Sequence, residues 1–236
     1  MIESGGIMLL TKTEYLTNMP TDILNEYGLT KTLLTRRETI YLKHVLKNIF
    51  IYGDEEYLKS KLDVLQFKSM FQYFSFVTNK LRAIYKIPRE YRVDNADNVV
   101  KLKRESFFKM LELYKDLKPI IIVDFDKTLT NTRFHTLYKY IIDDYYVIIN
   151  SANPMQDVIE SYLDKHNLPR PRKIFANKGK QKKITKLKDI VLTNQDKIFF
   201  YIDDEEEYLE YGCLLFMYCY KYTKDGKIYN YTFFKK

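Results

Sequence analysis

Apolar positions follow one pattern in the first half of the chain and another in the second. Between residues 55 and 87, apolar side chains recur every three or four residues, which predicts one long amphipathic helix that ends before Pro88. Similar spacing over 32–51 and 105–117 predicts further helices. We therefore expect an all-helical N-terminal region over residues 1–117, and it contains no catalytic motif.

After residue 118, short continuous apolar runs replace the helical spacing. Such runs are typical of strands buried in a parallel sheet, and they occur at 120–123, 146–149 and 198–202. Helical stretches are predicted among them at 135–143, 155–167 and 181–192. Alternating strands and helices imply right-handed crossovers and three layers. Residues 118–236 are therefore expected to form the second, α/β part of the chain.

The end of the chain predicts a β-hairpin. Two runs suited to strands, 214–222 and 228–234, flank the turn Lys224-Asp225-Gly226. Asp-Gly between two such runs is a strong hairpin signal. The predicted fold class is thus α/β: a three-layer, Rossmann-like parallel sheet with an all-helical N-terminal segment and a C-terminal β-hairpin.

Composition excludes several classes of protein. Of the 236 residues, 46% are hydrophobic and 16% aromatic, which is enough for a large core and excludes wholesale disorder. Cys213 and Cys219 are too few for a disulfide framework or a four-cysteine zinc site. No apolar run approaches the ~18 residues of a membrane span, and the start does not resemble a secretory signal. We expect a non-secreted protein of a reducing compartment, cytoplasmic or nuclear, without a membrane partner.

Positive charge is concentrated in one segment. The chain has 39 basic and 31 acidic residues, a net charge of +8, and Arg170–Lys188 holds nine basic residues and no acidic one. A local cluster of this kind attracts polyphosphate, nucleic acid or an acidic protein surface. A solvated basic helix without a special partner explains it equally well at this point.

The candidate functional residues follow the predicted strands directly. Ligands of open α/β sheets bind beyond the carboxyl ends of the strands, so these side chains should converge in one crevice. They are Asp124, Asp126 and Thr128 after the first run, Ser151 after the second, Asp203 and Asp204 after the third, and a lysine, Lys180 or Lys183, in the preceding helix.

Such a set of carboxylates requires compensation. Carboxylates a few ångströms apart repel by roughly 4 kcal/mol per pair at a surface-like dielectric. Oxygen ligands and the scarcity of histidine favour Mg²⁺ over zinc. Because Mg²⁺ uses only one or two protein carboxylates, another remains as a nucleophile or an acid–base group.

The order of these elements resembles the haloacid dehalogenase (HAD) superfamily. The resemblance covers residues 118–213, and its sharpest element is the run DFDKTLT that begins at Asp124. It implies a HAD-like core and a hydrolase of phosphoric monoesters that forms an aspartyl-phosphate. The presence of Asp126 indicates phosphate chemistry rather than carbon–halogen chemistry.

The resemblance also implies a role for each residue. Asp124 would be the nucleophile and Asp126 the general acid and base. Thr128 would orient Asp126, Ser151 would bind a phosphoryl oxygen, and a lysine would neutralise charge. We favour Lys180 over Lys183, because its distance along the chain from the Asp203-Asp204 pair is closer to that of the family.

The same resemblance implies how Mg²⁺ is held. The ligands would be the Asp124 carboxylate, the main-chain carbonyl of Asp126, and Asp204, with Asp203 binding directly or through water. Positioning and neutralisation of charge would supply most of the rate.

Short connections indicate an uncapped site. Too few residues lie between Thr130 and Ser151, or between Ser151 and Lys180, for a cap domain. Uncapped members of this superfamily tend to act on macromolecules, so we expect a phosphorylated nucleic-acid 3′-end or a phosphoprotein as substrate. Polynucleotide 3′-phosphatases, carboxy-terminal-domain protein phosphatases and phosphatases of large DNA viruses are similar in this respect. The composition would suit an AT-rich viral or parasite genome.

Other interpretations stay open. Aromatic residues near the site, Phe134, Phe175 and Tyr208, are candidates for base stacking, although ordinary packing is the more common role. The N-terminal helices are candidates for a protein-docking module, a lid or a stabilising layer. The alternative function is a non-catalytic HAD-fold scaffold or nucleic-acid-binding protein that acts through its helical half and basic segment.

Overall fold

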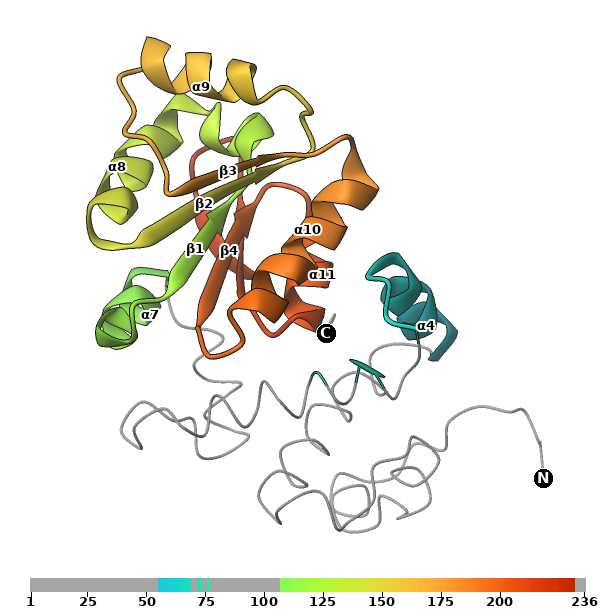
Figure 1. Ribbon diagram of the computed structural model, residues 1–236. Coiled ribbons are helices and arrows are strands. Elements are labelled where there is room, and N and C mark those ends of the chain that lie inside the picture. Colours follow the sequence, from blue (N-terminus) through green and yellow to red (C-terminus); the bar gives the residue numbers. More distant parts are fainter. Residues whose placement is uncertain (1–54, 69–71, 74–75, 77–106, 232–236) are drawn as a thin grey trace, which may run out of the picture.

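The computed structural model describes residues 55–68, 72–73, 76 and 107–231 of the chain (Figure 1). Its main helices and strands, in chain order, are α4 Glu55–Val64, α7 Phe107–Leu113, β1 Ile120–Val123, α8 His135–Asp144, β2 Tyr146–Ser151, α9 Gln156–Lys165, β3 Lys173–Ala176, α10 Lys180–Thr193, β4 Phe199–Asp203, α11 Glu206–Leu214, β5 Tyr218–Tyr222 and β6 Ile228–Tyr231. Short helical turns lie at Lys115–Leu117, Phe125–Leu129 and Thr132–Phe134.

The described strands form one six-stranded sheet in the order β3-β2-β1-β4-β5-β6. The first five strands are parallel, and only β6 runs antiparallel, to β5. In the centre, Ile122 of β1 pairs with Ile148 of β2 and Tyr201 of β4. The ends of β1, β2 and β4 therefore lie side by side. An α/β fold with a mostly parallel, Rossmann-like sheet is confirmed.

Alternate residues of each strand face opposite layers. In β1, Ile120 and Ile122 pack into the core beneath α10 and α11, whereas Ile121 and Val123 pack into the core beneath α7, α8 and α9. Because both faces of the strand are covered, every residue of β1 is apolar and buried. Figure 1 shows α10 and α11 on one side of the sheet, with α4 beside them.

The sequence pattern did not predict two elements of the sheet region correctly. Strand β3 lies at the edge of the sheet and is only half-buried, and the apolar run in its sequence KIFA is only three residues long. The predicted strand over 214–222 begins only at Tyr218, because Glu206–Leu214 forms α11 and Phe216 takes a turn conformation (φ 62°). The hairpin turn is confirmed, with Gly226 at φ 85°; residues 232–234 of its predicted second strand lie outside the described residues.

The single long helix predicted over 55–87 is wrong in its continuity. Helix α4 ends at Val64, and Gln66 adopts a left-handed conformation (φ 58°). The main-chain N–H of Phe67 bonds back to the Leu62 carbonyl at 2.9 Å, which closes the turn. The reversal turns Leu65 and Phe67 into the core beside α10 and α11. The helix predicted at 32–51 lies outside the described residues. So does most of the segment 69–106, which includes the rest of the helix predicted over 55–87.

Described residues on the N-terminal side of the predicted 117/118 boundary pack onto the sheet layers. The Phe107 ring of α7 lies 5.0 Å from the Tyr220 ring of β5. On the other side, the Gln181 amide of α10 donates to the Val64 carbonyl at 2.6 Å, so that it satisfies an end of α4. In their described parts, α4 and α7 thus pack against the layers of the sheet.

Candidate active site

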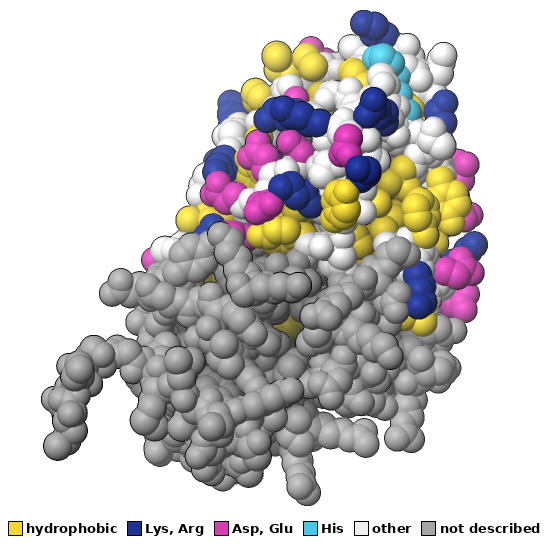
Figure 2. All heavy atoms as spheres, turned by 180° about the vertical axis from the view of Figure 1, so that it is seen from behind, with side chains coloured by type: hydrophobic (Ala, Val, Ile, Leu, Met, Phe, Trp, Pro, Cys, Tyr) yellow, Lys and Arg dark blue, Asp and Glu magenta, His cyan; other side chains and the backbone are white. Residues whose placement is uncertain are grey.

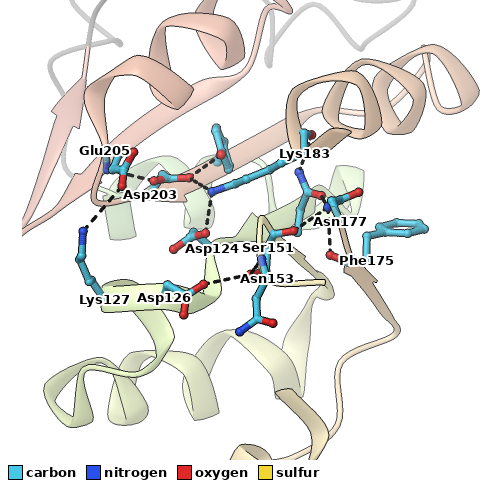
Figure 3. Close-up of polar contacts among 12 residues, drawn as sticks. Asp124, Asp126, Lys127, Ser151, Asn153, Phe175, Asn177, Lys183, Asp203 and Glu205 are labelled. Carbon is cyan, nitrogen blue, oxygen red and sulfur yellow. Dashed lines mark hydrogen bonds and ion pairs between the residues drawn. The ribbon is translucent and has the colours of Figure 1, made fainter. Parts of the chain in front are cut away.

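The candidate residues meet at the carboxyl edge of the central strands. Asp124 follows β1, Ser151 ends β2 and Asp203 ends β4, and the Asp124 N–H donates to the Ile202 carbonyl at 3.0 Å (Figure 3). The parallel register aligns these three strand ends at one level. Residues that are far apart in sequence are therefore brought together by the topology of the sheet.

Lys183 lies at the centre of the charged cluster. Its ammonium donates to Asp124 Oδ1 at 2.6 Å and to Asp203 Oδ2 at 2.8 Å, and only 2% of its side chain is exposed (Figure 3). The Tyr208 ring lies 3.7 Å from the ammonium on another side. Burial lowers the pKa of Lys183, but Asp203 and Asp124 outweigh burial, and the pKa is raised. The lysine is therefore a fixed positive charge.

Our preference for Lys180 is corrected by this geometry. Lys180 is the first residue of α10, and its exposed ammonium pairs with Glu207. The two lysines point to similar sides of the helix, but Lys183 lies about 4.5 Å further along the axis, where the helix passes over the strand ends. Distance along the chain to the Asp203-Asp204 pair does not report this depth, so it favoured the lysine that lies outside the buried cluster.

Asp203 is an anchor with both oxygens engaged. Besides Lys183, its Oδ2 accepts a hydrogen bond from the Tyr201 hydroxyl at 2.5 Å, and its Oδ1 accepts from the Glu205 N–H at 2.9 Å. Asp203 is fully buried. Burial and then the Asp203 carboxylate raise the pKa of Tyr201, so the phenol keeps its proton and remains a donor.

The acidic run after β4 is neutralised by lysines, with one exception. Each glutamate pairs with a lysine from another element: Glu205 with Lys127 at 3.7 Å, Glu206 with Lys221 at 2.6 Å, and Glu207 with Lys180. Within the described part of the chain, Asp204 has no ion pair. It is half-exposed, and its pKa is raised by burial and by Asp203.

Asp204 completes a group that fits a divalent cation. Carboxylate oxygens of Asp124, Asp203 and Asp204 all lie within 4.8 Å of one another. When ionised, these three carboxylates carry three negative charges against the single positive charge of Lys183, which pairs with Asp124 and Asp203. Burial and Asp203 also raise the pKa of Asp124 well above its usual value, against the effect of Lys183. An all-oxygen donor set with this charge suits a hard divalent cation.

Asp126 lies outside this acidic group and faces Ser151. The Ser151 hydroxyl donates to Asp126 Oδ2 at 3.3 Å and accepts a hydrogen bond from the Asn153 N–H at 3.0 Å (Figure 3). Lys127, at φ 60°, turns the chain immediately after Asp126. Asp126 is exposed, in contrast to the buried Asp124. The two aspartates therefore have different environments, as different chemical roles require.

Thr128 is placed differently from its expected role. Its side chain is fully buried, and its hydroxyl has no hydrogen-bond partner among the described residues. It therefore does not hold Asp126 by a side-chain hydrogen bond in this structure. The Thr128 carbonyl accepts from the Asn131 N–H at 3.2 Å, so the residue helps to close the turn through its main chain.

Sequence reasoning missed three residues of the site. They are Asn150, Asn177 and Tyr201. Asn150 had a detectable signal, because it interrupts an apolar run directly before Ser151. Tyr201 had none, because within its run it is indistinguishable from any buried aromatic residue.

Much of the basic segment is already engaged. Arg170 pairs with Asp164 at 2.7 Å, and Lys188 is buried and donates to the Gln66 carbonyl at 3.3 Å. Exposed basic residues without an ion pair within the described ranges are Arg172, Lys173, Lys178 and Lys182. Figure 2 shows a face of the molecule on which basic and acidic side chains are interspersed. The basic surface available to a polyanion is therefore smaller than the whole segment Arg170–Lys188.

The aromatic candidates for base stacking are mostly buried. Phe134 is fully buried, with its ring 4.8 Å from that of Tyr222, and Tyr208 is buried against Lys183. Phe175 is half-buried, and the Lys186 ammonium lies 5.0 Å from its ring. Ordinary packing, the more common role, is therefore what the structure shows for Phe134 and Tyr208.

Comparisons with known proteins found no family model, no curated protein and no solved structure that matches this chain. Among the described residues, no helix is both long and apolar enough to cross a membrane. The function must be inferred from the site itself.

Proposed function

We propose that this chain is a Mg²⁺-dependent phosphatase of the HAD type, which hydrolyses a phosphoric monoester on a macromolecule through an aspartyl-phosphate at Asp124. One observation carries the proposal: the Lys183 ammonium is held between Asp124 and Asp203, with Asp204 beside them. The resemblance to the HAD superfamily supports the same assignment through the order of these residues.

Asp124 is suited to attack phosphorus. Lys183 binds its Oδ1, which orients the carboxylate and leaves Oδ2 for the new bond. Because Asp124 is only 3% exposed, little bound water must be removed before it attacks. The lysine also compensates the negative charge that a phosphoryl group brings into the site.

Asp126 is the partner for proton transfer. In the first step, Asp124 Oδ2 bonds to phosphorus, the bond to the leaving oxygen breaks, and the Asp126 carboxyl gives its proton to that oxygen. In the second step, Asp126 takes a proton from water as the water oxygen bonds to phosphorus and Asp124 is released. The exposure of Asp126 admits both the leaving group and water.

Asp124 and Asp204 are the residues that would hold Mg²⁺, with the Asp126 carbonyl, and with Asp203 directly or through water. Mg²⁺ there would neutralise phosphoryl charge that Lys183 alone does not balance. Ser151, the last residue of β2, would turn its hydroxyl from Asp126 to a phosphoryl oxygen.

The connections around the site favour a large substrate. Between Thr130 and Ser151 there is room only for a short turn, α8 and β2, and between Ser151 and Lys180 only for α9 and β3. Neither connection contains a cap domain, so the site is open to a macromolecule. A nucleic-acid 3′-phosphate and a phosphoprotein are the two substrates to test.

The test is release of phosphate from an aryl phosphate and from a 3′-phosphorylated oligonucleotide, with Mg²⁺ and with a chelator. We expect Mg²⁺-dependent activity that Asp124→Asn abolishes and that Asp189→Asn, an exposed change on α10, leaves intact. The ratio between the substrates measures the preference for nucleic acid. A folded chain that releases phosphate from neither substrate, nor from a set of phosphopeptides, would overturn the proposal in favour of a non-catalytic scaffold.

A further inference from the structure

Two buried asparagines connect the strand that carries Ser151 to the helix that carries Lys183. The Asn177 amide donates to Asn150 Oδ1 at 2.9 Å and to the Ser151 carbonyl at 2.7 Å. The Asn150 amide in turn donates to the Lys183 carbonyl at 3.2 Å. Asn150 is fully buried and Asn177 is 7% exposed. Figure 3 shows Asn177 between Ser151 and the helix of Lys183.

These hydrogen bonds are additional to those that build the fold here. The main-chain N–H of Asn177 already bonds to the Ser151 carbonyl at 3.0 Å, and strands β2 and β3 are paired through Ser151 and Ala176. Apolar side chains of similar size would fill the same space without the need to satisfy buried amides. What the amides add is a link between β2 and α10, two elements that share no sheet pairing.

We propose that Asn150 and Asn177 are positioning residues that hold Ser151 in register with Lys183. The inference rests on the proposed function, in which the Ser151 hydroxyl and the Lys183 ammonium reach the same phosphoryl group from different elements. A shift of one element against the other misaligns these two groups even when each is correctly folded. The asparagines act through the main chain of Ser151 and of Lys183 and do not contact substrate.

A double-mutant cycle between Asn177→Ala and Ser151→Ala tests the inference, with hydrolysis of an aryl phosphate in Mg²⁺ as the readout. Asn177→Ala should lower kcat by roughly 10- to 100-fold, as losses of supporting hydrogen bonds do, with a smaller change in KM. Added to Ser151→Ala, the same change should cost less than about 3-fold, because the group that it positions has gone. Asn150→Ala is the second variant, and it should lower kcat in the same way.

Asn194→Ala is the matched control. The Asn194 amide also donates to a main-chain carbonyl of α10, that of Ile190 at 2.9 Å, but at the far end of the helix. It should change kcat less than about 2-fold, as expected for a site distant from the chemistry. Additive losses in the cycle, or an equal loss of kcat in Asn194→Ala, would show that the asparagines support only the fold.

The inference and the proposed function fail in different ways. An active wild type that Asp124→Asn inactivates, together with an additive cycle, overturns the inference alone. A folded wild type without activity that depends on Asp124 overturns the proposed function, and the inference falls with it.

Discussion

The ammonium of Lys183 lies 2.6 Å from Oδ1 of Asp124, and both side chains are almost completely withdrawn from water. Buried ion pairs are a poor way to gain stability, because the cost of desolvating two charges offsets most of their attraction. An apolar pair of similar volume would often be as stable. The ion pair is therefore better explained by chemistry at the site than by a contribution to the fold.

Replacing Lys183 should damage both stability and activity, whereas replacing Lys180 should damage neither. Lys183→Met leaves Asp124 and Asp203 buried without their cation, which costs about 3–5 kcal/mol in comparable buried pairs. Lys180→Met removes an exposed pair with Glu207, worth about 0–1 kcal/mol, and a contact at 5.7 Å with the Tyr208 ring. Urea unfolding and phosphate release measure the two effects.

If Lys183→Met is too unstable to assay, the combination with Asp203→Asn removes one of the two unpaired charges. This double variant should recover part of the stability but no activity, because Asp124 still lacks its lysine. Equal activity of Lys183→Met and Lys180→Met would contradict the assignment of Lys183.

The hydroxyl of Tyr201 should stabilise the folded state through Asp203. Tyr201→Phe removes a buried hydrogen bond to a charged group, and such bonds contribute about 1.5–3 kcal/mol. The matched control is Tyr145→Phe, because the buried Tyr145 hydroxyl has no hydrogen-bond partner among the described residues and its loss should be neutral or stabilising. Thermal melting of the two variants decides, and equal Tm values would argue against an anchoring role for Tyr201.

The sequence predicted the frame of this site better than its interior. Asp124, Ser151 and Asp203 could be placed together because each follows an apolar run, and parallel strands end at a common edge. Strand β3 was missed because its apolar run is only three residues long, and with it the position of Asn177 was missed. Asp126 and Thr128 were identified as candidates, but the burial of Thr128 could not be deduced.

The apolar pattern could not predict contacts that depend on how far along a helix a side chain lies. Lys180 and Lys183 have almost the same apolar spacing behind them, and only the packing of α10 over the strand ends distinguishes them. The break in the predicted helix after Val64 was hidden for a related reason. Leu65 and Phe67 are apolar and fit the helical spacing, but they reach the core through a turn.

Mg²⁺ should stabilise the protein through Asp204. At 100 times its Kd, a ligand that binds only the folded state adds about 2.7 kcal/mol. For a chain of this size that corresponds to an increase in Tm of roughly 5–10 °C. Asp204→Asn should lose most of this increase, whereas Glu205→Gln, which removes a charge paired with Lys127, should keep it. Melting curves with MgCl₂ and with a chelator make the measurement; an unchanged response in Asp204→Asn would exclude Asp204 as a ligand.

Stability should fall as the pH decreases through the titration of His135. Its ring nitrogen Nε2 lies 3.2 Å from the Leu129 carbonyl and 3.1 Å from the Tyr162 hydroxyl, and burial and then His166 lower its pKa. The unfolded chain therefore binds more protons than the folded chain below the ordinary histidine pKa of about 6.5. The stabilising contribution of neutral His135 is complete above that value and is lost below it.

The variant His135→Gln isolates this contribution. Between pH 7.5 and 5.5, the free energy of unfolding should fall less steeply in the variant than in the wild type. Other groups with shifted pKa values, Asp124 among them, are present in both proteins, so their effects cancel in the difference. Parallel curves from urea unfolding at each pH would show that His135 does not contribute to the pH dependence.

Recruitment of a polymeric substrate should depend on exposed lysines near the site and not on buried ones. The charges suited to this role are the exposed Lys178, two residues before α10, and the exposed Lys182 in its first turn, whereas Lys188 is buried against the Gln66 carbonyl. We expect Lys178→Gln with Lys182→Gln to lower kcat/KM on a 3′-phosphorylated oligonucleotide but not on an aryl phosphate. Each lost phosphate contact should also reduce the slope of log K against log salt by about 0.7 for a single strand.

Lys188→Gln separates recruitment from folding in the same assay. Lys188 donates to the Gln66 carbonyl in the turn that follows α4. Its loss should therefore lower Tm while the salt dependence of polymer hydrolysis stays unchanged. If instead the lysine changes at 178 and 182 reduce hydrolysis of both substrates equally, these side chains act on the site and not on recruitment. A phosphoprotein substrate would then be favoured, because its recognition does not require a row of exposed lysines near Asp124.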